Sequence, residues 1–327
     1  MDPLCIAVVS SRSMFGEPDA NLQHTLGWID RAADRMARLV CFPEIALQGY
    51  CTDHAMIHQL AESIDGPHIQ AVHHSAARHA LVVSIGMTLR DGNRCFNSQV
   101  FIGPNGVIGV QHKIHLCIGD TAYEPGSSWE IIDVWGWKVG TTICFDSEFP
   151  EAARVLAVRG ADLILMPFAT GRRDEIGRPA EPRGWAPRVH TYATARAYDN
   201  RVFVAGCNHA GTVPDPHGRA LANPQHVPDA EEWAPAGSVH RWPGYSFVVD
   251  PLGYMLTESD RTNHEANMVV ANLDPAQLKM ARTPLQAKWP QRTVHGDFVM
   301  VRRTDTFGDL MMNPKDVAMN RQTDRYT

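Results

Sequence analysis

The sequence predicts an α/β layered fold, in which a mixed β-sheet is covered by helices. Short runs rich in β-branched residues alternate along the chain with longer segments whose apolar residues recur at helical spacing. Turns such as Gly103-Pro104-Asn105-Gly106 join some neighbouring strands directly, so those pairs are antiparallel. The chain has 327 residues and is 44% hydrophobic, which is enough for one large domain or two medium ones.

The first part of the chain alternates strands with amphipathic helices. In the second segment Leu22, Leu26 and Ile29 recur at helical spacing, with charged residues on the opposite face. In order, the predicted elements are a strand at 4–10, a helix at 19–38, a strand at 39–42, a helix at 68–79, and strands at 80–89, 95–102 and 107–112.

The second part continues the alternation and contains one long interruption. Residues 211–243 have no usable periodicity, and a loop of this length inside a compact domain is usually either functional, for example a lid or pocket wall, or disordered. Beyond Pro275 the chain is polar and irregular, which predicts a surface extension. The predicted elements are strands at 131–134 and 137–143, a helix at 150–160, a strand at 162–166, a helix at 187–198, and strands at 201–207, 245–249, 254–257 and 268–273.

Composition excludes several classes of function. A net charge of −6, spread along the sequence, argues against nucleic acid or an anionic membrane as a partner. No apolar run is long enough to cross a bilayer, and the N-terminus does not resemble a signal peptide. The seven cysteines are scattered and odd in number, which is typical of a reduced protein, so we expect a cytoplasmic location.

Cys144 lies where one predicted strand ends and the next helix is about to begin. The strand runs to Ile143, and Pro150 and Glu151 are residues that suit a first helical turn. At such a position a thiol can be exposed and its thiolate favoured. The alternative is a buried cysteine that serves as a small apolar side chain, as most free cysteines do.

Two other strand ends carry charged residues that could act with this thiol. Glu44 follows the strand that ends at Phe42, and Lys113 follows the second strand of the hairpin. Each residue alone would more often be a solvated charge. A thiol nucleophile, however, needs a base that takes its proton and a cation that stabilises the developing oxyanion, and these two residues could supply both.

The segments around Glu44, Lys113 and Cys144 resemble, in order and in local sequence, those of the nitrilase superfamily, the carbon–nitrogen hydrolases. Several further motifs carry the same resemblance, which covers roughly residues 4–275. These motifs are Tyr123-Glu124-Pro125-Gly126, the segment from Ala195 to Val204 leading to Cys207-Asn208, and the segment from Ser246 to Gly253.

This resemblance implies a four-layer α-β-β-α sandwich with two mixed sheets and a catalytic triad of Glu44, Lys113 and Cys144. It also implies that the backbone N–H of Phe145 assists Lys113 at the oxyanion, and that no metal or organic cofactor is needed. We therefore expect a hydrolase domain at 1–275 with an insertion at 211–243. The extension at 276–327 is expected to form subunit contacts in a homodimer or larger homo-oligomer.

One position departs from the family pattern. Many members have a second glutamate seven residues before the glycine that corresponds to Gly126, and that position here is Gly119. The neighbouring Asp120 is the candidate for this carboxylate after a small shift of the loop, although a plain loop aspartate is the alternative. Glu124 is a weaker candidate, because its position next to Pro125 varies in the family.

The residues after the nucleophile favour one branch of the family. Phe145-Asp146 resembles amidases and carbamoylases, whereas true nitrilases often have tryptophan and glutamate there. We therefore predict hydrolysis of a small amide or N-carbamoyl compound, with nitrile hydrolysis or acyl transfer from the same acyl-cysteine as alternatives. D-amino-acid carbamoylases carry arginines shortly after the cysteine to hold the substrate carboxylate, whereas this chain has Ser147 and Glu148 there. This favours a neutral or cationic substrate, unless Glu148 forms a salt bridge within its own loop.

The remaining candidates line the expected substrate pocket or flank it. We predict that Tyr50, Phe145, Glu148, Phe168 and Asn208 bind substrate, with Trp185 as a further aromatic wall, although large aromatics near strand ends are as often core residues. Arg172 and Arg173 could reach a carboxylate or could be solvated.

The histidines of the chain do not predict a metal site. His209, His217, His226 and His240 lack the paired spacing of zinc ligands. We expect His112 and His115 to orient Lys113, which lies between them.

Overall fold

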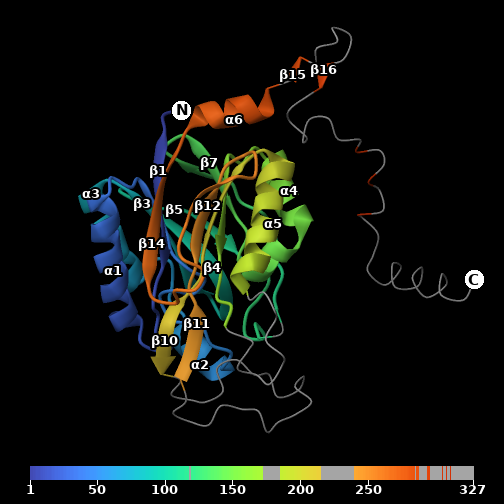
Figure 1. The fold of residues 1–327 in the computed structure, drawn as a ribbon. Helices are drawn as coiled ribbons and strands as arrows, with labels where there is room; N and C mark the ends of the chain where they lie inside the picture. The colour runs from blue at the N-terminus through green and yellow to red at the C-terminus, as the bar shows by residue number, and fades with distance from the viewer. Residues whose placement is uncertain are drawn as a thin grey trace, which may run out of the picture.

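The computed structural model contains two six-stranded sheets that pack face to face, with helices on both outer faces (Figure 1). The structure describes residues 1–117, 119–171, 185–214, 239–283, 285–286, 293–294, 304, 307 and 310. The predicted four-layer α-β-β-α sandwich is therefore confirmed.

The first sheet is mixed. Its strand β1 pairs in parallel with β2 and antiparallel with β14, which brings the end of the domain back beside its beginning. In sheet order the strands are β14 (Asn267–Leu273), β1 (Leu4–Ser10), β2 (Leu39–Cys41), β3 (Val82–Asp91), β4 (Arg94–Gly103) and β5 (Gly106–His112).

The second sheet is also mixed. Its three central strands β7, β8 and β9 run parallel, and the antiparallel strands β12 and β6 flank them. In sheet order the strands are β13 (Met255–Glu258), β12 (Ser246–Val249), β9 (Phe203–Cys207), β8 (Leu163–Pro167), β7 (Trp137–Thr141) and β6 (Ile132–Val134).

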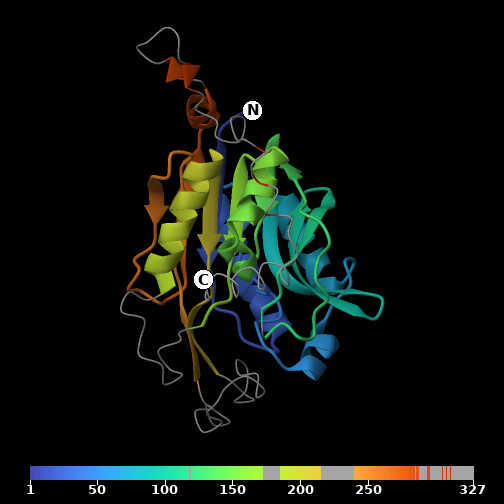
Figure 2. The ribbon, with the colours of Figure 1, turned by 90° about the vertical axis from the view of Figure 1, so that its right-hand side faces the viewer.

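Three apolar layers hold the sandwich together. The inner layer lies between the sheets and contains, for example, Ile6, Val8, Leu163 and Phe203, all fully buried. In the central strands, alternate residues face outward and pack against helices, as expected for strands buried on both faces. The first sheet is covered by α1 (Pro18–Asp34) and α3 (Pro67–His79), and the second by α4 (Pro150–Val158) and α5 (Trp185–Asn200) (Figures 1 and 2).

Two regions differ from the sequence-based prediction. The ends of the 211–243 segment are the arms of a hairpin, β10 (Ala210–Pro214) and β11 (Val239–Pro243), although no regular structure was predicted there. A short helix, α2 (His54–Leu60), was not predicted either. The side chain of Asp53 caps it by accepting a hydrogen bond from the Met56 N–H, a local signal in the sequence.

The chain after Pro275 was predicted to be irregular, but it begins with a helix. Helix α6 (Pro275–Arg282) starts there, with Asp274 as its N-cap and proline in its first turn. Beyond it the structure describes two short strands, β15 (Leu285–Gln286) and β16 (Thr293–Val294), and most of the predicted extension lies outside the described residues. None of the described helices is long and apolar enough to cross a membrane.

Candidate active site

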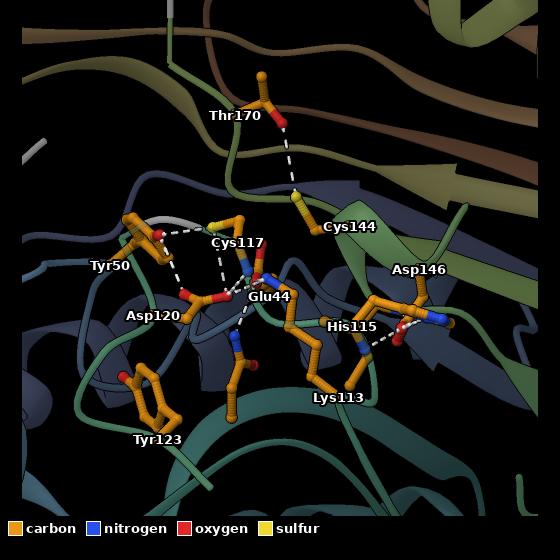
Figure 3. A network of polar contacts seen from close by, with 12 residues as sticks. Glu44, Tyr50, Lys113, His115, Cys117, Asp120, Tyr123, Cys144, Asp146 and Thr170 are labelled. Carbon is orange, nitrogen blue, oxygen red and sulfur yellow. Dashed lines mark hydrogen bonds and ion pairs between the residues drawn. The ribbon is translucent and has the colours of Figure 1, made fainter. Parts of the chain in front are cut away.

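The structure brings Glu44, Lys113 and Asp120 into direct contact, and Cys144 lies beside them (Figure 3). Glu44 follows β2, Lys113 follows β5, and Cys144 follows β7, so three strand ends from both sheets meet at one place. Asp120 comes from the loop after Lys113.

The backbone around Glu44 is held in an unusual position. Ile45, the next residue, has a left-handed φ of 46°. This turn lies against Gly86 of β3 so closely that a Cβ added at Gly86 would be 2.3 Å from the Ile45 nitrogen and from the Pro43 oxygen. His209 donates a hydrogen bond from Nε2 to the Glu44 carbonyl oxygen at 2.7 Å. Glycine at position 86 is therefore a condition for placing Glu44.

The two carboxylate oxygens of Glu44 have different surroundings. Oε1 accepts hydrogen bonds from Lys113 Nζ and from Asn97 Nδ2, both at 2.7 Å. Oε2 is buried and has no hydrogen-bond partner among the described residues. A buried carboxylate oxygen normally has a partner, so Oε2 is an acceptor available for an incoming proton.

Lys113 is buried and lies between two carboxylates. Its Nζ is 2.7 Å from Glu44 Oε1 and 2.7 Å from Asp120 Oδ2. Burial acts to lower the pKa of Lys113, but the charges of Glu44, Cys144 and Asp120 outweigh it and the pKa lies well above its usual value. Lys113 therefore remains a cation.

The backbone of Lys113 is fixed by two hydrogen bonds. The Lys113 N–H donates to the Asn97 carbonyl oxygen at 2.8 Å, and the Gly126 N–H donates to the Lys113 carbonyl oxygen at 2.8 Å. A Cβ at Gly126 would lie 2.8 Å from the His112 oxygen, which explains the glycine of the Pro125-Gly126 motif.

Asp120 occupies the place of a second acidic partner for the lysine. In addition to Lys113, it accepts hydrogen bonds from Tyr50 Oη at 3.1 Å and from the Cys117 N–H at 3.1 Å. Burial raises the pKa of Tyr50 well above its usual value, so the phenol stays protonated and able to donate. The catalytic role expected for Asp120 stays a prediction.

Cys144 is the first residue of a 3₁₀ turn, η1 (Cys144–Glu148), and has a left-handed φ of 48°. Its side chain is half-buried, and its Sγ lies 3.6 Å from Thr170 Oγ1. Burial and the negative charge of Glu44 raise the pKa of the Cys144 thiol well above its usual value, while Lys113 acts in the opposite direction. A non-glycine residue in this conformation is strained, which is common at functional sites.

Asp146 links the turn that contains Cys144 to the segment that follows Lys113. This buried carboxylate accepts hydrogen bonds from the N–H groups of Ile143 at 3.1 Å and His115 at 2.7 Å. His115 Nδ1 is also 2.9 Å from Asp146, whereas His112 Nδ1 contacts Ser98. The two histidines expected to orient Lys113 thus contact Asp146 and Ser98, not the lysine amine.

The residues predicted to bind substrate have diverse environments. Phe168 is buried, with its ring centroid 5.1 Å from that of Trp185, whereas Phe145 is exposed. Glu148 lies 4.0 Å from Arg188 of α5, so its partner is on a helix outside its own loop. Asn208 is buried and bonds to the backbone of Thr170. Their role in binding substrate stays a prediction.

Several residues of the site were missed from sequence. Asn97 contacts the Glu44 carboxylate, and Gln99, two residues along β4, donates to the Phe42 carbonyl oxygen at 3.1 Å. The run of three polar residues Asn97-Ser98-Gln99 inside a predicted strand was the available signal for these two. Thr170 and His209 act through contacts between distant segments, for which the sequence has no local signal.

The side chains of most of the histidines considered as metal ligands in and next to the insertion lie outside the described residues. His209 contacts Glu44, and the side chains of His217, His226 and His240, like Arg172 and Arg173, lie outside the described residues. In the described part of the chain, no three His, Cys, Asp or Glu side chains are grouped so as to hold a metal ion.

Comparison with known proteins identifies the family. A family model described as carbon-nitrogen hydrolase matches residues 5–283. The chain belongs to this family. It is therefore an enzyme of the amidase and nitrilase type, and the resemblance noted in the sequence is confirmed.

Among its relatives, the chain is 30% identical over 278 residues to an (R)-stereoselective amidase from Pseudomonas, covering 85% of this chain and 87% of that protein. It is 27% identical to a citrullinase from Francisella tularensis, covering 85% and 92% of the two chains.

Solved structures agree on the fold. A carbon-nitrogen hydrolase from Helicobacter pylori matches with a TM-score of 0.77 at 22% identity, over 95% of this chain and 99% of that one. An amidase from Nesterenkonia matches with a TM-score of 0.68 at 19% identity, over 94% and 97%.

Proposed function

We propose that this protein hydrolyses the C–N bond of a small carboxamide or N-carbamoyl compound, with Cys144 as nucleophile. The observation that carries the proposal is the unshared Oε2 of Glu44, held beside a buried cation and a strained cysteine. The relatives named amidase and citrullinase support the same type of bond.

The first half of the reaction forms a thioester. Glu44 takes the thiol proton on Oε2, and Cys144 Sγ attacks the carbonyl carbon of the substrate. The oxyanion that develops is stabilised by Lys113 and by the backbone N–H of Phe145. Glu44 then returns the proton to the leaving nitrogen, and ammonia departs from a primary amide.

The second half releases the acid and restores the enzyme. Glu44 takes a proton from water, and the resulting hydroxide attacks the thioester carbon. Collapse of this intermediate breaks the C–S bond and returns the proton to Cys144. The balance is amide plus water to acid plus ammonia. From an N-carbamoyl compound, the carbamic acid formed loses carbon dioxide and leaves the amine.

The test is an ammonia-release screen over primary amides, N-carbamoyl compounds and nitriles, with Cys144→Ala as the blank. Cys5→Ala is the matched control, because Cys5 is half-exposed on β1 and distant in sequence from the site. We expect ammonia from the first two classes, none from Cys144→Ala and normal rates from Cys5→Ala. Hydrolysis by Cys144→Ala would contradict the proposal.

The same screen separates the alternative reactions. Turnover of nitriles would indicate a nitrilase. Hydroxylamine added to an amide reaction would yield mainly hydroxamate from an acyltransferase and mainly free acid from a hydrolase, because the two nucleophiles compete for one acyl-cysteine.

We also infer a cytoplasmic enzyme that works as a homodimer or larger homo-oligomer. Seven cysteines, free in the structure, support a reducing compartment. Light scattering of the full chain tests the assembly, and a monomeric mass would contradict it.

A further inference from the structure

Thr170 is the residue whose hydroxyl lies nearest the nucleophile in the described hydrogen-bond network. Its Oγ1 is 3.6 Å from Cys144 Sγ, within hydrogen-bonding distance for sulfur (Figure 3). Thr170 comes from the segment after β8, in the second sheet, whereas Glu44 and Lys113 come from the first. The thiol thus lies between an acid–base group and a neutral hydroxyl.

The backbone of Thr170 is fixed by Asn208. Asn208 Oδ1 accepts from the Thr170 N–H at 3.1 Å, and Asn208 Nδ2 donates to the Thr170 carbonyl oxygen at 2.9 Å. The same Oδ1 accepts from the His209 N–H at 2.9 Å, and the Asn208 side chain is fully buried. Asn208 therefore locks the strand end from which the Thr170 hydroxyl extends.

The thiolate of Cys144 needs such a donor. Burial and the charge of Glu44 both oppose ionisation of the thiol. Lys113 and, more weakly, a backbone hydrogen bond from Ala169 favour it. The Lys113 ammonium group already pairs with two carboxylates, Glu44 and Asp120, which offset much of its charge. A hydroxyl that donates to an ionised acceptor forms one of the stronger hydrogen bonds in proteins.

We propose that Thr170, positioned by Asn208, is a catalytic residue whose hydroxyl donates a hydrogen bond to the Cys144 thiolate. The proton of Sγ passes to Glu44 Oε2, and Thr170 keeps its own proton throughout. When sulfur bonds to the substrate carbon its negative charge is lost, and the hydrogen bond weakens. This proposal rests on the proposed function only in taking Cys144 as the nucleophile.

The test measures the thiolate without any substrate. Iodoacetamide alkylates thiolates, so its rate at Cys144, followed by the mass of the peptide that contains it, reports ionisation. Thr170→Val keeps the shape of the side chain and removes the hydroxyl. Losing this hydrogen bond should slow alkylation about tenfold at each pH below the thiol pKa, which corresponds to a rise of about one pKa unit.

Two further variants make the result specific. Thr170→Ser retains the hydroxyl and should restore the alkylation rate close to that of the wild type. Thr191→Val is the matched control, because Thr191 is exposed on α5 and bonds only within its own helix in the described network. Unchanged or faster alkylation in Thr170→Val, or equally slow alkylation in Thr170→Ser, would overturn the proposal.

Failure of this proposal is distinguishable from failure of the proposed function. Hydrolysis by Cys144→Ala would remove the nucleophile role of the thiol, yet the alkylation profile would still show whether Thr170 stabilises its thiolate. Conversely, Thr170→Val could be alkylated at Cys144 as fast as the wild type while Cys144→Ala is inactive. This result would leave the hydrolase assignment intact and reject only the proposed role of Thr170.

Discussion

The proposed acid–base part and the proposed nucleophile part of this site are built in different ways. Glu44, Lys113 and Asp120 are fully buried and joined by ion pairs of 2.7 Å. Cys144 is half-buried on a strained turn, and its thiol has a long contact to Thr170. Figure 3 shows the dense network on one side of the thiol and the single hydroxyl on the other.

The difference follows from what burial demands of charged and neutral groups. Charges inside a protein must be paired, so the acid–base residues are also structural residues. The thiol is neutral in the resting state because its pKa is raised, and it needs no such partner. We therefore expect substitutions in the acid–base part to affect folding and catalysis, and substitutions at Cys144 to affect catalysis alone.

The largest effect on folding should come from Lys113→Met. This change leaves Glu44 and Asp120 as two buried carboxylates without a cation, and losing one partner of a buried ion pair costs about 3–5 kcal/mol. Urea unfolding followed by circular dichroism measures the loss. Lys138→Met is the control, since its pair with Asp133 is exposed and should contribute little. Equal stability of the two variants would mean that the buried pair is not structural.

Glu44→Gln should separate hydrolysis from thiol reactivity. Without its general base the enzyme should lose about a thousandfold in kcat, the typical contribution of a positioned base. Cys144 alkylation should become faster, because the Glu44 charge raises the pKa of the thiol and its removal increases the thiolate fraction at neutral pH. Iodoacetamide rates and ammonia release on one preparation provide both measurements. A decrease in both rates would instead indicate a collapsed site.

Gly86→Ala tests how closely the Glu44 turn must approach β3. The added Cβ would meet two backbone atoms at 2.3 Å, so the turn has to move, which should cost about 1–3 kcal/mol in stability. Activity should fall as well, because Glu44 moves with the turn. Gly27→Ala in α1 is the matched control: nothing lies within 4 Å of its added Cβ, and helix propensity predicts a gain of about 1 kcal/mol. Thermal unfolding compares the two.

The sequence predicted most of the fold because each long element carries its own periodicity. The strands of the Gly103–Gly106 hairpin and the helix at 68–79 agree with the structure to within about two residues. The short helix α2 and the arms β10 and β11 were missed, since seven- and five-residue segments show little periodicity. The conformation of these segments is determined by tertiary packing and not by a local sequence pattern.

The residues of the candidate site likewise include some that the sequence could predict and some that it could not. Glu44, Lys113 and Cys144 could be predicted as candidates, because each follows a recognisable strand and together they match a family pattern. Asn97 and Thr170 were not found, because each contributes a single contact to a residue that is distant in the chain. Such contacts depend on how the two sheets pack, which no local pattern encodes.

The smallest effect that still separates the two parts of the site is expected from Tyr50→Phe. This change removes the 3.1 Å hydrogen bond from Tyr50 Oη to Asp120, at a cost of about 1–2 kcal/mol in stability. Because Asp120 holds Lys113, kcat for ammonia release should also fall several-fold. Tyr123→Phe is the control, since its hydroxyl bonds to Thr88 at 3.0 Å and not to Asp120 in the described network. It should lose similar stability in urea and keep its kcat, and equal losses of kcat in both variants would show that Asp120 does not transmit the effect.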